Sequence, residues 1–255
     1  MIAENSRLSP VNNDVYESLG ERWYRATDDP VALLRAESRL RNPWIASELA
    51  RAGEGRPCRV LDIGCGGGFL SNALAAAGHE VSGLDASGDA LRVAALHDPS
   101  RSVRYQQGNA LQLPYENESF DAVCAMDFLE HVEDPGRVIG EAARVLKPSG
   151  RFYFHTFNRN FLAWLIIIKG VEWFVRNTPK DLHVLRLFLK PAAVRAACAE
   201  HGLHSLELRG VRPKLGLAFW RMLVTGRVSD DFCFTFSHST SLGYSGVARK
   251  SGILP

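Results

Sequence analysis

The stretch VLDIGCGGG, residues 60–68, constrains the fold of this chain more than any other feature. A short apolar run ends there in four glycines within five positions, and the stretch FLSNALAAAG follows directly. The apolar residues before the glycines predict a buried strand, and the alanine- and leucine-rich residues after them predict a helix that ends at Gly78. Because glycine leaves the backbone bare, a ligand can lie against this turn and accept hydrogen bonds from its N–H groups.

The same alternation continues along the chain and predicts the fold class. Strand and helix patterns alternate from Cys58 onward, which is typical of a mostly parallel sheet with helices on both faces. We therefore expect an α/β protein, in which residues 232–237 and 244–250 are candidate closing strands. The other predicted strands are residues 58–63, 80–85, 103–108, 120–126, 151–157 and 204–210, and the predicted helices are residues 31–52, 69–78, 88–97, 135–146 and 191–202.

Composition and charge exclude several classes of protein. Thirty basic and twenty-eight acidic residues give a formal charge of +2, which is too balanced for a protein that wraps nucleic acid. The five cysteines stand singly without a C-x-x-C pair, so we expect no zinc cage or disulfide framework and a reducing, cytoplasmic setting. The N-terminus is polar and lacks the apolar segment of an export signal. The longest apolar run, residues 161–168, is far shorter than the ~20 residues that span a bilayer.

Positions after the second and third predicted strands fit a ligand that carries a ribose. Asp85 ends the second strand about twenty residues beyond the first glycine, where a carboxylate can accept both hydroxyls of a ribose. Asn109 and Ala110 follow the third strand, where an adenine edge could be read. Structural roles remain open, because Asp85 can cap the helix that follows and the glycines can form a plain tight turn. A nicotinamide dinucleotide fits poorly, because its fingerprint needs a small residue in place of Phe69.

These motifs together resemble the class I S-adenosylmethionine-dependent methyltransferases. The resemblance rests on LDIGCGGG, GLD, FDAVCAMDFLEHVEDP and RVLKPSG, in this order. It implies a Rossmann-like fold with a mostly parallel, seven-stranded sheet and a site for S-adenosylmethionine. The glycine loop and Asp62 would hold the methionine part of the cofactor, Asp85 the ribose, and Asn109 with Ala110 the adenine. The cofactor-binding residues implied by the resemblance are Asp62, Gly64, Cys65, Gly66, Gly68, Asp85, Ala86, Asn109, Ala110 and Met126.

The wider chain is similar to the O-methyltransferases of ubiquinone biosynthesis, which methylate phenolic hydroxyls on polyprenylated ring precursors. The similarity rests on Arg22-Trp23, on NPW at residues 42–44 and on residues 156–191. It implies leader and lid helices over residues 1–52 and a methyltransferase domain over residues 53–255, with an insertion at about 157–190 that faces substrate or lipid.

Two positions depart from the pattern of that family. Ile45 stands where the family carries an arginine that contacts the cofactor, so Arg39 or Arg41 would have to replace it. In the insertion, Val184 stands where the family carries an aspartate after the histidine that matches His183.

The insertion carries an apolar segment that fits a lipid-like ligand. Residues 161–175 are rich in Phe, Leu, Ile, Val and Trp, and Lys169 and Glu172 interrupt the run. This pattern is typical of a helix that lies at a membrane interface. Such a helix would admit a prenyl tail and would place the protein at the inner face of a membrane as a peripheral protein. The alternative is a lid helix that packs against its own core or a dimer partner.

The stretch MDFLEHVEDP, residues 126–135, places two carboxylates and an imidazole within five positions. On a helical turn Asp127, Glu130 and His131 would share one face, at the carboxyl end of the fourth strand where α/β sheets bind ligands. Three hypotheses remain open. The three side chains bind a divalent cation, for which hard oxygen ligands favour Mg or Mn; His131 accepts a proton from the substrate without a metal; or the turn only shapes the pocket. Further candidates on this side are His155, Asn158, Arg159 and His183.

The prediction for function is an S-adenosylmethionine-dependent O-methyltransferase that acts on a phenolic or catechol-like hydroxyl, most readily of a polyprenylated ubiquinone precursor. Such an acceptor needs help with deprotonation, because a phenol with a pKa near 10 is mostly neutral at pH 7. One alternative is a methyltransferase for a soluble metabolite, which would bury the apolar insertion. Another is a non-catalytic scaffold of the same fold, which would have lost cofactor binding.

Overall fold

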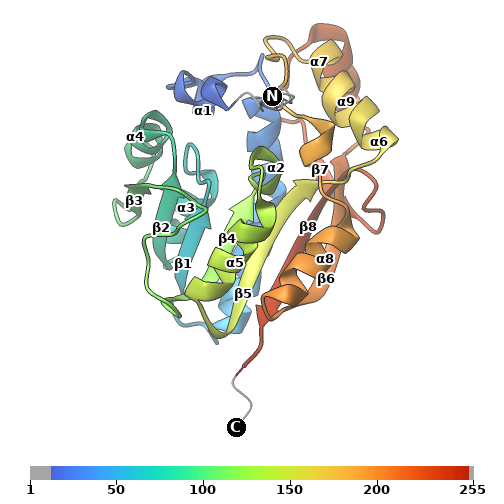
Figure 1. Ribbon diagram of the computed structural model, residues 1–255. Coiled ribbons are helices and arrows are strands. Elements are labelled where there is room, and N and C mark those ends of the chain that lie inside the picture. Colours follow the sequence, from blue (N-terminus) through green and yellow to red (C-terminus); the bar gives the residue numbers. More distant parts are fainter. Residues whose placement is uncertain (1–12, 253–255) are drawn as a thin grey trace, which may run out of the picture.

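The computed structural model describes residues 13–252, which form one eight-stranded sheet with helices on both faces (Figure 1). The strands lie in the order β3-β2-β1-β4-β5-β8-β6-β7. The pairs from β3 to β5 are parallel, whereas β8 is antiparallel to β5 and β6, and β7 is antiparallel to β6. The bounds are β1 (Arg59–Ile63), β2 (Glu80–Asp85), β3 (Arg104–Gln107), β4 (Phe120–Met126), β5 (Leu146–Phe157), β6 (Leu203–Pro213), β7 (Phe234–Ser237) and β8 (Gly243–Lys250).

The predicted α/β fold with a mostly parallel centre is confirmed, and its predicted strand count is corrected from seven to eight. The additional strand is β7, which the chain forms after a helix and pairs with the outer edge of β6. Both candidate closing strands are therefore real, and each takes a separate place in the sheet. Residues 1–12 of the predicted leader and residues 253–255 of the predicted domain lie outside the described part of the chain.

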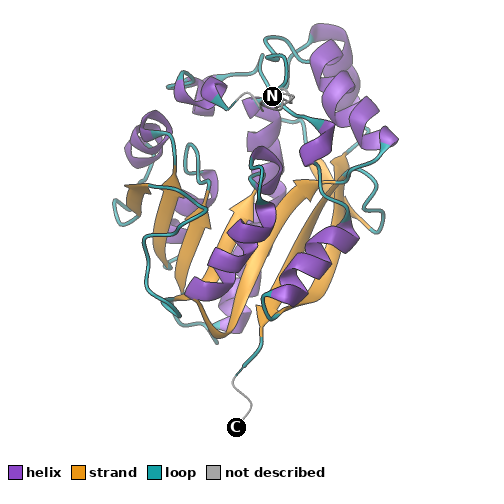
Figure 2. Ribbon diagram, viewed as in Figure 1, coloured by secondary structure: helices purple, strands orange, loops and turns teal. Residues whose placement is uncertain are grey.

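Helices pack on the two faces of the sheet (Figure 2). In this view α5 and α8 lie in front of the sheet and α2 lies behind it, together with α3. The helix bounds are η1 (Asp14–Glu17), α1 (Arg22–Arg25), α2 (Val31–Ala52), α3 (Phe69–Ala76), α4 (Gly88–Leu96), η2 (Leu129–His131), α5 (Pro135–Val145), α6 (Phe161–Ala163), η3 (Trp164–Gly170, π-helical), α7 (Val171–Phe174), η4 (Leu185–Leu187), α8 (Pro191–Glu200) and α9 (Leu217–Thr225).

The core follows the two-residue period of the strands. On β5, Phe152 and Phe154 join the apolar cluster that contains α5 and α8, whereas Tyr153 joins the cluster that contains α2 and α3. On β4, Val123 and Cys124 divide between the same two clusters. Both faces of the central strands are therefore buried, as expected for parallel strands covered by helices.

The edge of the sheet where the parallel strands end carries the remaining segments. The N-terminal helix α1 lies above one half of this edge, and α7 and α9 lie above the other half (Figure 1). The insertion begins after β5 and folds as the successive helical segments α6, η3 and α7. Among the described residues, no helix combines the length and the apolarity that crossing a membrane requires.

Candidate active site

A cavity of about 1000 Å³ opens at the carboxyl ends of the parallel strands. Its walls come from the N-terminal helices, the glycine loop, the ends of β2 and β4, the insertion, and α9 with the strands beside it. Sites for drug-sized ligands typically measure ~300–1,000 Å³, so a cavity of this size has room for a cofactor and an acceptor together.

The glycine loop adopts a conformation that side chains would prevent. Gly64 has a φ of 68° and Gly66 a φ of 49°, both in the left-handed region that glycine enters most easily. A Cβ atom on Gly64 would lie 2.1 Å from the ring of Phe128, and one on Gly66 would lie 2.7 Å from the ring of Trp23. The glycines thus allow two aromatic rings to approach the backbone, and both rings form walls of the cavity.

Asp85 lies beside this loop and holds it. One oxygen of its carboxylate accepts the Gly66 N–H at 2.8 Å, and the other accepts the Ser87 N–H at 2.8 Å. Burial raises the pKa of Asp85, and these hydrogen bonds oppose that effect. Each carboxylate oxygen has a second acceptor position, so a ribose hydroxyl can still donate to it. The helix cap is Ser87, whose hydroxyl accepts the Ala90 N–H at 3.2 Å.

Asp62 lies on the floor of the cavity at the end of β1. Its side chain is almost fully buried and accepts a hydrogen bond from the Ser71 hydroxyl at 2.6 Å. Burial raises the pKa of Asp62 to about 7, and the hydrogen bond from Ser71 opposes this effect. A cationic amine in the cavity would favour the charged form of the carboxylate, so this position suits the amino group of a ligand.

Most, but not all, of the predicted cofactor residues reach the cavity. Gly68 instead allows close packing, because a Cβ atom there would lie 2.5 Å from the Tyr105 hydroxyl. Asn109 is exposed and its side chain accepts the Leu111 N–H at 2.9 Å, while Ala110 is buried in the core. The predicted residues that line the cavity are Asp62, Gly64, Cys65, Gly66, Asp85, Ala86 and Met126.

Aromatic side chains from the N-terminal helices cover the glycine loop. Trp23 is 3% exposed and stacks on Tyr16, with ring centroids 5.7 Å apart. The Tyr24 hydroxyl donates to the Gly67 carbonyl at 2.8 Å, and the Tyr24 ring contacts the edge of Phe69. Tyr16 was not among the predicted site residues, because nothing in its local sequence distinguishes it from other aromatic residues.

The turn after β4 divides the predicted acidic and histidine residues into two groups. Glu130 and His131 lie in the short helix η2, whereas Asp127 precedes it with a φ of 53°. The predicted trio is therefore not brought together, because Asp127 faces a different set of partners. The first group is Glu130, His131 and His183, and the second is Glu37, Asp127 and His155; within each group the ligand atoms all lie within 4.8 Å of one another.

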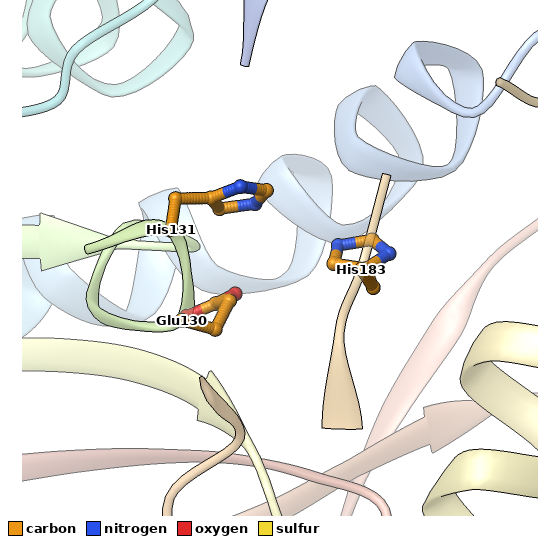
Figure 3. A group of neighbouring side chains, drawn as sticks. All are labelled: Glu130, His131 and His183. Atoms are coloured by element: carbon orange, nitrogen blue, oxygen red, sulfur yellow. The ribbon is translucent and has the colours of Figure 1, made fainter. Parts of the chain in front are cut away.

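The first group, which we call the open cluster, lies between the sheet and the insertion (Figure 3). Glu130 is 0% exposed, and neither of its carboxylate oxygens has a well-formed hydrogen bond among the described residues. Burial and then the charge of Asp127 raise the pKa of Glu130 to about 8. Burial lowers the pKa of His131 to about 4 and that of His183 to about 3, so both imidazoles are neutral at pH 7.

The second group, which we call the closed cluster, contains its own cation. Both guanidinium NH groups of Arg41 donate to the Asp127 carboxylate, and Glu37 lies 3.4 Å from Arg41. Nε2 of His155 is 3.5 Å from Asp127, and its Nδ1 is 2.9 Å from the Ser245 hydroxyl. Burial would raise the pKa of Asp127, but Arg41 and His155 outweigh burial and lower it.

Of the two arginines expected to contact the cofactor, Arg41 lies on the wall of the cavity, where its guanidinium pairs with Asp127. Arg39 instead donates to backbone carbonyls near the end of the chain. Glu37 was missed, because a Glu and an Arg four residues apart on a helix usually form a surface pair. Here burial raises the pKa of Glu37 to about 8, and the charge of Arg41 opposes that effect.

Asn158 and Arg159 do not reach the cavity. The Asn158 side chain donates to the Thr240 carbonyl at 2.8 Å, and the Arg159 guanidinium donates to the Arg186 carbonyl at 3.3 Å. These contacts fasten the start of the insertion to the β7–β8 loop and to η4. The structure therefore gives both residues an anchoring role.

Comparison with known proteins matches the central part of the chain to a family of methyltransferase domains, over residues 61–154. The chain is 36% identical to the ubiquinone biosynthesis O-methyltransferase of Aromatoleum aromaticum over 210 residues, covering 81% of this chain and 88% of the relative. It is 33% identical to the enzyme of the same name from Ralstonia nicotianae, covering 98% of both chains. The sequence resemblance thus extends beyond the central sheet to nearly the whole chain.

Solved structures support the fold independently. The magnesium protoporphyrin IX methyltransferase of Synechocystis, solved with bound S-adenosylhomocysteine, superposes with a TM-score of 0.58. It is 19% identical in sequence, and the match covers 83% of each chain. At this level of identity the likeness concerns the fold, and it agrees with the Rossmann-like sheet described above.

Proposed function

We propose a function from the family to which this chain belongs, the ubiquinone biosynthesis O-methyltransferases. The chain transfers a methyl group from S-adenosylmethionine to a phenolic hydroxyl of a ubiquinone precursor. The observation that carries this proposal is a single cavity that joins the glycine loop and Asp85 to His131 and His183. The loop side fits the donor, and the histidine side fits an aromatic acceptor.

The methyl-transfer reaction determines which tasks the residues of the site must perform. The acceptor oxygen forms a bond to the methyl carbon while the carbon–sulfur bond breaks, and the electron pair of that bond stays on sulfur. No acid is needed at the leaving group, because the sulfonium leaves as a neutral sulfide. The acceptor must lose its proton, and a free phenol with a pKa near 10 holds that proton at pH 7. The site must therefore align the two atoms and favour the phenolate.

The loop side of the cavity has the features that S-adenosylmethionine needs. Backbone conformations that only glycine adopts easily keep the loop free of side chains, and Asp85 offers oxygens to ribose hydroxyls. Asp62 would meet the amino group of the methionine part, and Met126 would flank the cofactor. Trp23 would close over the bound donor and exclude water from the reacting atoms.

The histidine side fits a divalent cation as a second component. The two oxygens of Glu130 are buried without well-formed hydrogen bonds, and both nearby imidazoles are neutral. A bound cation would lower the pKa of the acceptor phenol and orient its oxygens. His131 and Glu130 would hold that region, and Asp127 would act by positioning Arg41 and α2.

The acceptor in this proposal carries a prenyl tail, and the protein meets the inner face of a membrane. Apolar residues of the insertion and α9 line the cavity, which suits a hydrocarbon chain. Trp173 on α7 lines the cavity and is still 63% exposed, and outside the cavity α9 exposes 57% of Trp220 and 79% of Leu217. Exposed apolar side chains on neighbouring helices are typical of surfaces that meet lipid.

A methyl-transfer assay tests the proposal. Labelled S-adenosylmethionine would be offered with prenylated catechols and with soluble catechols that lack the tail. We expect transfer to the hydroxyl of the prenylated acceptors, with the Asp85→Ala variant losing donor affinity at least tenfold. Preference for the soluble acceptors would contradict the prenyl assignment, and donor binding without transfer to any acceptor would contradict the activity.

Vesicle flotation tests the membrane contact separately. The double variant Trp173→Ser/Trp220→Ser should bind vesicles that contain anionic phospholipid at least fivefold more weakly than the unaltered protein. The matched control is Leu96→Ser on α4, a residue that is 72% exposed and lies away from the cavity walls. Equal binding by all three proteins would show that these tryptophans do not meet lipid.

A further inference from the structure

We infer that Gly170 makes room for the hydrocarbon tail of the acceptor, and that it is a specificity-determining residue of the insertion. The inference rests on the proposed function and concerns the same cavity. Its new elements are the place of the tail, between the insertion and α9, and the reason why a glycine stands at this position.

The cavity has an apolar part between the insertion and α9, which we call the tail channel. Its walls include Ile167, Val171, Val175, Phe219, Met222 and Phe232. The end of the insertion and α9 also share one apolar cluster, and α7 and α9 are neighbours above the sheet (Figure 1). Among the described residues from 157 to 234, no acidic residue, lysine or arginine lines the cavity. The channel therefore suits an uncharged hydrocarbon chain, whose burial is favourable in proportion to its area.

Gly170 lies on the face of the insertion that lines this channel. Residues three and four positions apart on a helix share a face. Ile166 and Ile167 before Gly170 line the cavity, and so do Trp173 and Phe174 after it. Gly170 itself is part of the same wall. A side chain at position 170 would therefore project into the channel.

The backbone at position 170 does not require glycine. Its φ of −63° and ψ of −41° are those of an ordinary helix, which almost every residue type adopts easily. Glycine within a helical run lowers stability relative to alanine, because its backbone loses more freedom on folding. The local conformation therefore gives no reason for this residue.

Close packing does not require glycine either. Apart from its neighbours along the helix, a Cβ atom on Gly170 would meet only the Leu165 carbonyl oxygen, at 3.5 Å, an ordinary van der Waals distance. By contrast, a Cβ atom on Gly64 would lie 2.1 Å from the ring of Phe128. What Gly170 leaves free is space on the wall of the channel, which a ligand can use.

The segment that ends at Gly170 is fixed on its other side. Trp164–Gly170 is π-helical, a rare conformation that is frequent at functional sites. Within this segment Ile168 is 7% exposed and belongs to an apolar cluster with Phe157 and Phe188. Because the wall is held by this packing, a larger side chain at position 170 would narrow the channel instead of moving the wall away.

The channel has its mouth beside Gly170. Ile166, Trp173 and Phe174 line the cavity and are also exposed on the surface of the protein. His183, on the histidine side, lines the same cavity. A ring held on the histidine side can therefore extend its tail past Gly170 to the mouth.

Calorimetry with the full-length protein and bound S-adenosylhomocysteine tests the inference without methyl transfer. The two probes are a farnesyl-substituted catechol and catechol itself. The unaltered protein should bind the farnesyl probe more tightly, because the channel buries its tail. Gly170→Leu should weaken binding of the farnesyl probe about tenfold, because overfilling a packed site is unfavourable, and should leave catechol affinity within about twofold. Gly170→Ala should weaken farnesyl binding by less, about threefold.

The matched control is Gly136→Leu on α5. Gly136 is also helical and half-buried, and a Cβ atom there would meet only Oδ1 of Asp134, at 3.5 Å. It does not line the cavity, so this variant should bind both probes like the unaltered protein. Urea unfolding checks that both leucine variants are folded, and neither should be less stable than the unaltered protein, because each replaces a helical glycine.

Two outcomes would overturn the inference alone. One is farnesyl affinity that is equal in Gly170→Leu and the unaltered protein, including the case in which only vesicle flotation is weakened, which would assign the channel to a lipid acyl chain. The other is an equal loss of affinity for both probes, because a residue of the tail channel should affect only the tail. If neither probe bound the unaltered protein, the proposed acceptor class would be wrong and the inference with it.

Discussion

The open and closed clusters contain similar kinds of side chain, and the difference that matters most is the source of positive charge. The closed cluster has two carboxylates and a histidine around the Arg41 guanidinium. The open cluster has a carboxylate and two neutral histidines, and no lysine or arginine of the described residues forms an ion pair with Glu130. The first is complete within the chain, whereas the second, in the proposed function, would take its positive charge from a bound ion.

The difference shows why buried acidic residues near a ligand cavity need separate explanations. Arg41 connects α2 to the end of β4, so the closed cluster joins the N-terminal helices to the sheet. The open cluster joins the sheet to the insertion through His131 and His183. One cluster therefore joins elements of the fold around the cavity, and the other, in the proposed function, would take part in the chemistry inside it.

The largest expected effect comes from removing the internal cation. Arg41→Met leaves Asp127 buried without its partner, which should lower the free energy of unfolding by about 3–5 kcal/mol. Urea unfolding measures this change. The matched control is Arg92→Met, whose pair with Asp89 is largely exposed and should contribute less than about 1 kcal/mol. Equal losses in the two variants would contradict a closed cluster that supports the fold.

The next effect is stabilisation of the open cluster by an added ion. At a free Zn²⁺ concentration about 100 times the dissociation constant, the free energy of unfolding should rise by about 2.7 kcal/mol. Glu130→Gln should abolish this gain, because it removes the charged ligand. If Glu37→Gln, in the closed cluster, abolished the gain instead, the ion would not bind at the open cluster.

A smaller effect is the pH dependence of stability that Glu37 contributes. Its folded pKa, about 8, is raised above the ordinary value of 4.5, so its contribution is fully present below pH 4.5 and is lost as the pH rises through 8. One such group changes stability by at most about 1.4 kcal/mol per pH unit in this window. Glu37→Gln should therefore show a shallower fall in stability between pH 6 and 8 in thermal unfolding. A fall as steep as that of the unaltered protein would show that Glu37 does not titrate there.

The smallest effect concerns the outer edge of the closed cluster. Ser245→Ala removes the hydroxyl that pairs with Nδ1 of His155, and should lower the free energy of unfolding by about 1 kcal/mol. It should leave Zn²⁺ binding unchanged, because the open cluster does not share this contact. Calorimetric Zn²⁺ titration and urea unfolding of the same variant give the two results, and a weakened ion affinity would mean that the clusters are coupled.

Local patterns were enough to predict the sheet and the glycine loop with Asp85 beside the cavity. The strands follow from short apolar runs that alternate with helical stretches, and Asp85 follows from its distance beyond the glycine loop. Contacts between distant residues could not be predicted in the same way. Asp127 and Arg41 lie 86 positions apart, and no local spacing brings them together.

The acidic turn shows most clearly why spacing alone misleads. The spacing of Asp127, Glu130 and His131 predicts that they share one helical face, but η2 contains only three residues and Asp127 lies outside it with a positive φ. Asp tolerates this conformation better than most residues. His183 was a separate candidate, and only the path of the insertion brings it to His131.

The measurement that tests the account most directly is anomalous diffraction from crystals soaked in Zn²⁺ or Co²⁺ after chelator treatment. The account predicts one strong peak within bonding distance of Glu130, His131 and His183, with the Arg41–Asp127 pair intact. A peak bound by Asp127, with Arg41 displaced, would contradict it, and so would a fully soaked crystal with no peak between η2 and the insertion.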